Sequence, residues 1–160
     1  QRYIDESRCF AMRKNKFKYR VFPDYISVNR YYGKNEKLNM DPEFLGKPVR
    51  KLVKGSFAYN KYLEKIVICS EVRHIGDECF SGCEKLQEVV IPESVRYIGE
   101  RAFCGCMDLE KIEIKGKLLY LGKDAFLKCE KLTEVITSAE QNEEVYNELV
   151  KSGLKVKRNF

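Results

Sequence analysis

Hydrophobic residues recur every 23 positions along the stretch from Leu45 to Ser138. In each unit a leucine is followed by two apolar residues at alternate positions, and a phenylalanine lies in the other half. The repeated series are Leu52, Ile75, Ile98 and Leu121; Phe57, Phe80, Phe103 and Phe126; Leu63, Leu86, Leu109 and Leu132; and Ile66, Val89, Ile112 and Val135. A period of about 20–29 residues with this apolar core is the signature of a leucine-rich-repeat solenoid.

The first half of each unit has the form L-x-x-[V/I]-x-[V/I], as in Leu86–Ile91. Its last three residues alternate like a short strand, so Val89 and Ile91 are expected to point inward and Val90 outward. One unit cannot bury its apolar side alone, whereas stacked units close a continuous core through parallel strand pairing. The pattern therefore predicts a β-rich parallel solenoid.

The second half of the unit carries a glycine directly after the inward isoleucine or leucine, at Gly76, Gly99 and Gly122. We expect a sharp turn at this point, because glycine adopts backbone conformations that a Cβ atom restricts. The phenylalanine that follows is expected to fill each layer.

Both ends of the array differ from the repeats, and a solenoid requires capping units there. Residues 1–44 are predicted to form an N-terminal antiparallel β cap, with strands near 17–21, 26–30 and 37–40 separated by turn signals. Residues 45–138 form four repeats, and residues 139–160 a helix and strand that cap the other end. Ser138 and Gln141 have the spacing of a capping box. The apolar face of the predicted helix consists of Val145, Tyr146, Leu149 and Val150.

The run Leu86–Cys106 closely resembles the BspA-type leucine-rich repeats of bacteria, whose pattern is L-x-x-V-x-I-P-x-S-V-x-x-I-G-x-x-A-F-x-x-C. The resemblance covers roughly residues 38–138 and implies a leucine-rich-repeat solenoid with short helical turns. It also implies a non-enzymatic module that binds a protein or glycan, of a type found on secreted or surface proteins. Local departures occur at Val53–Lys54, Asn60 and Lys115–Lys117.

The net charge of +6 is concentrated in the N-terminal part, where residues 1–48 hold 11 Lys and Arg against 6 Asp and Glu. The segment 13–20 mixes basic and aromatic residues, but alternation already explains Phe17 and Tyr19 as core, so we expect no nucleic-acid partner. No apolar stretch approaches the ~20 residues of a membrane helix, so we expect no membrane insertion. The chain begins at Gln1, which leaves a leader sequence and the compartment open.

The chain has seven cysteines, so at least one has no partner within a monomer. Cys83, Cys106 and Cys129 share one repeat position and are expected to be small buried fillers, since free cysteine is commonly buried. The alternative is a disulfide or metal site along this series. We expect no metal and no cofactor, because zinc requires a tetrahedral ligand set that a straight series does not offer. An odd cysteine count is compatible with a cytoplasmic protein, whereas the resemblance favours a secreted one.

The sequence contains no recognisable catalytic motif. Its single histidine, His74, shares an outward repeat position with Lys51, Tyr97 and Tyr120, where a tolerated surface side chain is the simplest interpretation. We therefore expect no enzymatic activity.

Repeat register predicts two rows on the concave face of the strands. The first row alternates in charge and is either a ligand-binding row or a self-satisfied series of ion pairs: Lys65, Glu88, Lys111 and Glu134. The second row is mostly apolar and is either a binding surface or the ordinary preference of strands for β-branched residues: Val67, Val90, Glu113 and Ile136.

A third row, on the opposite arm of each unit, contains Arg50, Arg73 and Arg96, followed by Leu119. It is either a docking strip for an acidic partner or glycan, or a solvated stripe neutralised by nearby acids. The candidate acids are Glu71, Glu93 and Glu100. The favoured function is an interaction module; the alternatives are a structural spacer without a ligand and a cysteine-based metal protein.

Overall fold

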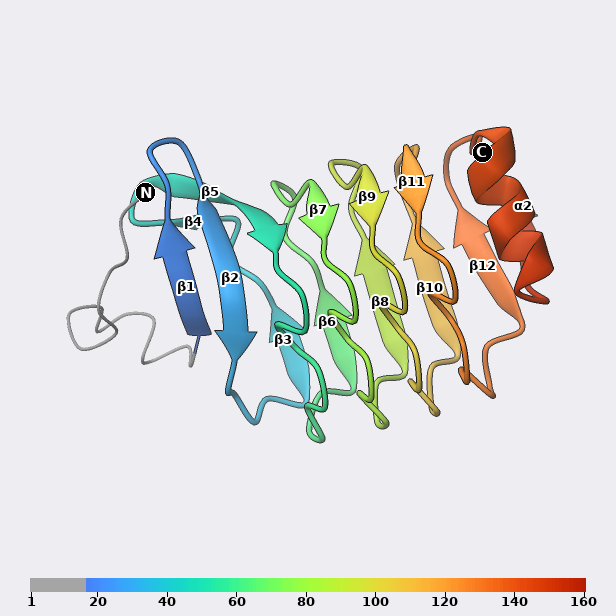
Figure 1. The fold of residues 1–160 in the computed structure, drawn as a ribbon, viewed down its shortest axis with the longest axis horizontal. Coiled ribbons are helices and arrows are strands. Elements are labelled where there is room, and N and C mark those ends of the chain that lie inside the picture. Colours follow the sequence, from blue (N-terminus) through green and yellow to red (C-terminus); the bar gives the residue numbers. More distant parts are fainter. Residues whose placement is uncertain (1–16) are drawn as a thin grey trace.

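The computed structural model describes residues 17–160. They form a solenoid whose successive turns contribute strands to two sheets (Figure 1). The first sheet is seven-stranded and follows the order β1 (Phe17–Val21), β2 (Ile26–Tyr31), β5 (Lys47–Leu52), β7 (His74–Ile75), β9 (Tyr97–Ile98) and β11 (Tyr120–Leu121), with β4 (Glu43–Phe44) paired to β5. The second is six-stranded and follows the order β13 (Lys155–Arg158), β12 (Glu134–Thr137), β10 (Lys111–Ile114), β8 (Glu88–Ile91), β6 (Lys65–Val67) and β3 (Lys37–Asn39).

The pairing register follows the sequence period. In the second sheet Ile66 lies beside Val89 and Val89 beside Ile112, and in the first sheet Ile75 lies beside Ile98. Each of these pairs is parallel and joins residues 23 positions apart. The prediction of a parallel leucine-rich-repeat solenoid is confirmed.

The core runs continuously between the two sheets because equivalent apolar side chains lie on one another. The repeated phenylalanines form a buried stack, with ring centroids 4.9 Å apart for Phe57 and Phe80, 5.1 Å for Phe80 and Phe103, and 5.6 Å for Phe103 and Phe126. The large apolar area removed from water in each layer is the main stabilising contribution to the fold.

The regular spacing of Gly76, Gly99 and Gly122 has a different cause from the sharp turn expected from the sequence. None of the three has a left-handed backbone. A Cβ atom on Gly99 would lie 2.4 Å from the backbone nitrogen of Asp77, and one on Gly122 would lie 2.3 Å from that of Glu100. Glycine is required here because the preceding layer passes too close for any side chain.

The N-terminal cap is antiparallel in β1 and β2, as predicted, but the third predicted strand belongs to the solenoid. β3 pairs in parallel with β6 and places Leu38 beside Ile66, in the register of the repeats. The alternation of residues 37–40 indicates a strand without indicating which strand lies beside it, so the expected antiparallel pairing of this segment was wrong. Residues 1–16 of the predicted cap, with Cys9, lie outside the described residues.

The helix α2 (Glu143–Lys151) confirms the predicted C-terminal helix but begins at a different cap. The side-chain oxygen of Asn142 accepts a hydrogen bond of 2.9 Å from the backbone nitrogen of Val145, which satisfies one of the unpaired donors at the start of a helix. The predicted Ser138–Gln141 capping box is therefore wrong. The buried face of the helix is also narrower than expected, since only Val145 and Leu149 of the four predicted residues are buried.

Gln141 closes the backbone of the preceding layer instead of capping the helix. Its side-chain amide accepts a bond of 3.0 Å from the backbone nitrogen of Leu118 and donates one of 2.9 Å to the carbonyl of Gly116. After α2, Gly153 adopts a left-handed φ of 80° and β13 pairs in parallel with β12. Within residues 17–160, no helix has both the length and the apolar composition that a membrane crossing requires.

Candidate functional site

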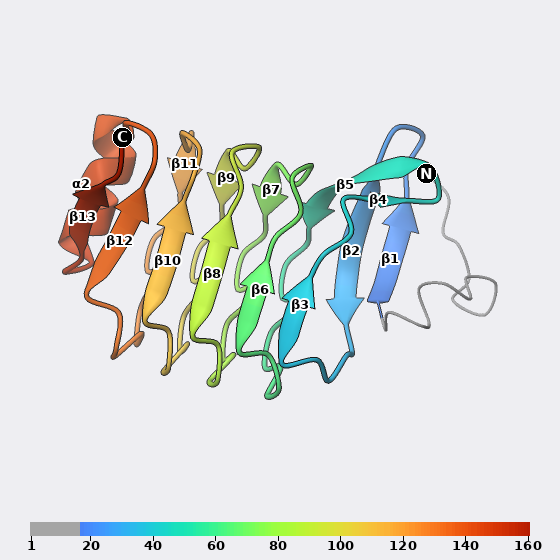
Figure 2. The ribbon, with the colours of Figure 1, turned by 180° about the vertical axis from the view of Figure 1, so that it is seen from behind.

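The outer side of the second sheet carries the two predicted rows, and Figure 2 looks onto this sheet. Lys65, Glu88 and Lys111 lie on neighbouring strands in direct register. The Glu88 carboxylate lies 3.3 Å from the Lys65 ammonium and 3.7 Å from that of Lys111. These three residues form the predicted series of ion pairs, whereas Glu134 has no ion pair within residues 17–160. Because these side chains are partly exposed to solvent, each pair contributes little to stability.

The second row of this sheet is continuous across the strands. Val67 lies beside Val90, Val90 beside Glu113, and Glu113 beside Ile136. All four side chains are half-buried by their neighbours rather than fully exposed, yet no helix of the described residues lies over them (Figure 2). Three apolar side chains and one carboxylate therefore form an accessible strip next to the ion pairs.

The arginine row lies at one edge of the first sheet, where backbone hydrogen bonds hold successive layers in register. The nitrogen of Arg73 donates to the carbonyl of Arg50 at 2.8 Å, and the nitrogen of Arg96 donates to the carbonyl of Arg73 at 2.9 Å. Leu119 continues the series with a bond of 2.7 Å to the carbonyl of Arg96. The predicted alignment of the three arginines is thus present in the backbone.

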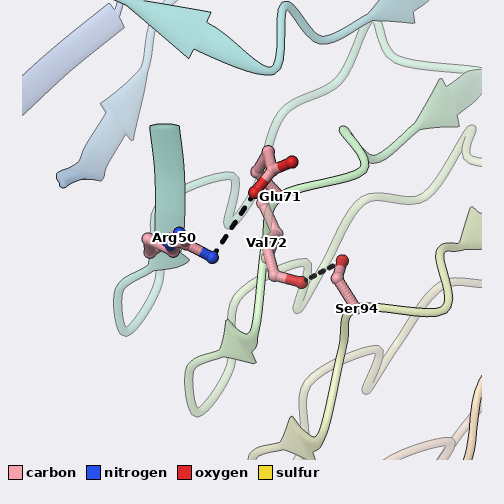
Figure 3. Close-up of polar contacts among 4 residues, drawn as sticks. All are labelled: Arg50, Glu71, Val72 and Ser94. Carbon is pink, nitrogen blue, oxygen red and sulfur yellow. Dashed lines mark hydrogen bonds and ion pairs between the residues drawn. The ribbon is translucent and has the colours of Figure 1, made fainter. Parts of the chain in front are cut away.

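The arginine side chains differ in their partners. Arg50 forms an ion pair of 3.4 Å with Glu71, close to the 2.6 Å bond from the Ser94 hydroxyl to the Val72 carbonyl (Figure 3). Arg96 donates to the backbone carbonyl of Glu93 rather than to its carboxylate.

Arg73 is exposed and has no ion pair within the described residues. Of the three acids expected to neutralise the row, only Glu71 pairs with an arginine of residues 17–160; Glu93 and Glu100 form no such pair there. Two guanidinium groups therefore retain uncompensated positive charge.

The strands β7, β9 and β11 carry a stack of aromatic rings. Each of these residues directly follows a member of the arginine row or Leu119 in the sequence. The rings of His74 and Tyr97 are 4.2 Å apart and inclined by 5°, and those of Tyr97 and Tyr120 are 4.6 Å apart and inclined by 13°. Burial lowers the pKa of His74, and the charge of Lys51 lowers it further. The sequence analysis assigned these residues to the same repeat position but did not predict that their rings stack. Three planar side chains spaced 23 residues apart could have predicted the stack.

Most cysteines of the described residues are buried thiols within the repeats. All six in this part of the chain are free, and all except Cys104 are buried. Each thiol of the repeated position donates to the carbonyl of the phenylalanine in the preceding layer: Cys83 to Phe57 at 3.1 Å, Cys106 to Phe80 at 3.2 Å and Cys129 to Phe103 at 3.0 Å. The prediction of buried fillers is confirmed.

Burial raises the pKa of Cys79 and of Cys83 to about 12. A protonated thiol is a poor nucleophile and a poor metal ligand. Across residues 17–160, no group of three or more His, Cys, Asp or Glu residues has an arrangement that could hold a metal ion.

The repeats match the model of a known family, the BspA type leucine rich repeat region, over residues 50–155 with 6 copies. The chain belongs to this family. No curated protein matches the sequence.

Solved structures of bacterial leucine-rich-repeat proteins share the fold. A leucine rich repeat protein from T. pallidum is 26% identical, with a TM-score of 0.65 over 76% of this chain and 68% of that one. One from Bacteroides capillosus is 19% identical, with a TM-score of 0.71 over 78% of this chain and 96% of that one. A leucine rich cell surface protein from Faecalibacterium prausnitzii is 18% identical, with a TM-score of 0.57 over 76% of this chain and 43% of that one.

Proposed function

We propose that this chain is a non-enzymatic interaction module that binds a protein or glycan ligand through the outer faces of its solenoid. The main binding surface would be the outer side of the second sheet: Lys65, Val67, Glu88, Val90, Lys111, Glu113, Glu134 and Ile136. An acidic part of the ligand would contact the row Arg50, Arg73 and Arg96.

The observation that carries this proposal is the uncovered apolar strip. Val67 and Val90 are neighbours on adjacent strands, their side chains are half-buried, and no helix of the described residues covers this sheet (Figure 2). Apolar side chains next to charged ones on an open surface are typical of protein interaction sites. Solenoids commonly bind ligands along such extended surfaces, because each successive layer places equivalent side chains at the same position of the surface.

The arginine row supports an additional acidic contact. Arg73 and Arg96 are exposed and have no carboxylate partner among the described residues, so a ligand carboxylate or sulfate would not have to displace an existing ion pair. Arginine also binds planar anionic groups with two parallel hydrogen bonds, which favours recognition of such ligands.

The proposal is tested by probing a glycan array and a defined array of purified proteins with the wild-type chain and with variants. Val90→Asp should abolish binding to any ligand that uses the apolar strip, because it introduces a charge into the contact. Val150→Asp is the matched control, since Val150 is exposed on α2, an element that carries none of the row residues. Replacing Arg73 and Arg96 with Glu tests the acidic contact.

Loss of binding with Val90→Asp but not with Val150→Asp would support the strip as the binding surface. Absence of any bound ligand, or equal binding by all variants, would contradict the proposal and favour a structural spacer. Each variant is first checked for a folded circular dichroism spectrum so that unfolding is not mistaken for lost contact.

A further inference from the structure

The turns that follow the first sheet form a directional stack of hydrogen bonds. In each inner layer, backbone nitrogens at three alternate residues donate to carbonyl oxygens of the next layer. One layer shows the rule, with bonds of 2.8 Å from Glu78 to Glu100, 2.7 Å from Phe80 to Ala102 and 2.8 Å from Gly82 to Cys104. The donors therefore all point toward the C-terminal end of the solenoid.

The last turn has the same three donors but no layer beyond it. The equivalent nitrogens belong to Asp124, Phe126 and Lys128, and none of them has an acceptor within residues 17–160. Phe126 is only 6% exposed, so its unpaired N–H group is notable. Nearly all buried backbone N–H groups in proteins have a hydrogen-bond partner.

Several other parts of this end of the solenoid are covered. β13 extends the second sheet, the Gln141 side chain binds the backbone at Gly116 and Leu118, and α2 packs against β11. What remains is a groove of about 390 Å³, with Phe126, Leu127 and Lys128 on one side and Glu148, Lys151 and Ser152 of the helix end on the other.

We propose that this groove binds a main-chain segment of a partner protein, which adds one more turn to the stack. Three carbonyl oxygens at alternate residues of that segment would accept hydrogen bonds from Asp124, Phe126 and Lys128. The inner layers provide the template, because the same donors bind peptide carbonyls there. Leu127, which is 42% exposed, supplies an apolar surface for a side chain of the segment.

Two other occupants fit the groove less well. A free anion would meet the carboxylates of Asp124, Glu130 and Glu148, which also line it and outnumber the two lysines. A second copy stacked head to tail would need free acceptors in its first repeat. The central one, the carbonyl of Ser56, already accepts a bond of 2.8 Å from the nitrogen of Tyr31.

This site is separate from the two solenoid faces, so each proposal can fail without the other. The experiment uses the full chain labelled with ¹⁵N and a peptide of residues 97–106 with Cys104→Ser and Cys106→Ser. This peptide contains the carbonyls of Glu100, Ala102 and Cys104, which occupy the equivalent acceptor positions in the fold. The amide signals of Asp124, Phe126 and Lys128 should shift, with a dissociation constant on the order of a millimolar for so short and flexible a ligand.

Hydrogen exchange at these three amides should slow by about tenfold near saturation, because bonded amides exchange only after release. Leu127→Arg should weaken peptide binding about tenfold, since it places a charged side chain in the groove. Leu119→Arg, the same change at an exposed leucine of the arginine row, should leave binding within about twofold. If Leu127→Arg fails to fold, the wild-type exchange measurement still decides the question.

Three results would overturn the proposal. The first is the absence of shifts at the three amides, or shifts of equal size at amides remote from the groove. The second is the same set of shifts with inorganic phosphate alone, which would identify an anion site. The third is shifts that grow with protein concentration without peptide, which would identify a second copy as the occupant.

Discussion

Individual residues in the turns adopt backbone conformations that the stack imposes on them. One repeat position holds Gly82 and Gly105, with φ of 72° and 74°, but also Tyr59 and Lys128, each with φ of 60°. The backbone nitrogen of Tyr59 donates the same interlayer hydrogen bond of 2.8 Å as those of Gly82 and Gly105. Tyr59 and Lys128 therefore have a left-handed backbone, which costs a residue other than glycine about 1–2 kcal/mol.

Lys128→Gly should consequently stabilise the protein. The left-handed strain of about 1–2 kcal/mol is removed, while the additional flexibility of glycine in the unfolded chain costs about 0.5–1 kcal/mol. The expected net gain in the free energy of unfolding is about 0.5–1 kcal/mol, measured by urea denaturation.

Lys123→Gly is the matched control, because Lys123 is an exposed lysine of the same turn without a left-handed backbone. It should lower the free energy of unfolding by about 0.5–1 kcal/mol, since only the flexibility cost remains. If both variants change stability in the same direction, backbone strain at Lys128 does not explain the effect.

At the scale of the strand, the alternation of apolar and polar residues predicted which side chains of β8 point into the core and which point outward. Val89 is fully buried and Val90, its neighbour, is half-buried on the outer side of β8, as the sequence predicted. Alternation could not predict the parallel partner of β3, because it indicates which side of a strand faces inward and not which strand lies beside it. It also could not predict where Arg96 directs its guanidinium, since side-chain conformation depends on local contacts that the repeat leaves free.

Val89→Asp and Val90→Asp should therefore have very different effects on stability. A carboxylate at position 89 would be buried without a partner, which typically costs several kcal/mol and unfolds a marginally stable domain. At position 90 the carboxylate reaches solvent, and the loss should be about 1 kcal/mol from reduced apolar contact and strand preference. Thermal unfolding followed by circular dichroism compares the two variants directly.

A large fall in melting temperature for Val90→Asp, comparable with that of Val89→Asp, would show that Val90 belongs to the core. It would also remove the basis for the uncovered strip. The two substitutions are identical in chemistry and adjacent in sequence, so differences in composition cannot account for an unequal result.

For the whole molecule, the 23-residue period determines which residues of neighbouring layers lie on one another. It therefore predicted the rows of side chains on the two sheets and the stacking of the repeated phenylalanines. The two ends could not be predicted in the same way, because they break the repeat. Gln141 and Asn142 stand 23 positions after Leu118 and Leu119 but use their side-chain amides to bind that layer's backbone. Their polar character was visible in the sequence, but the groups they satisfy become apparent only once the layers are in place.

The cap formed by Gln141 should control how unfolding begins. Its side chain is 9% exposed and makes two hydrogen bonds to the backbone of the preceding layer. Gln141→Ala leaves those buried groups without partners, which should lower stability by about 1–3 kcal/mol. In a repeat protein, stability is transmitted mainly between neighbouring layers, so the loss should be local.

Hydrogen exchange measures this directly. In Gln141→Ala, the amides of Leu118 and Gly122 should exchange much faster than in the wild type, whereas those of Ile75 and Gly76 should change little. Gln87→Ala is the matched control, because Gln87 is exposed and its side chain makes no hydrogen bond among the described residues. Uniformly faster exchange along the chain would mean that the layers unfold as one unit, whereas a gradient that starts at the last layer would show that the polar cap keeps the end of the stack closed.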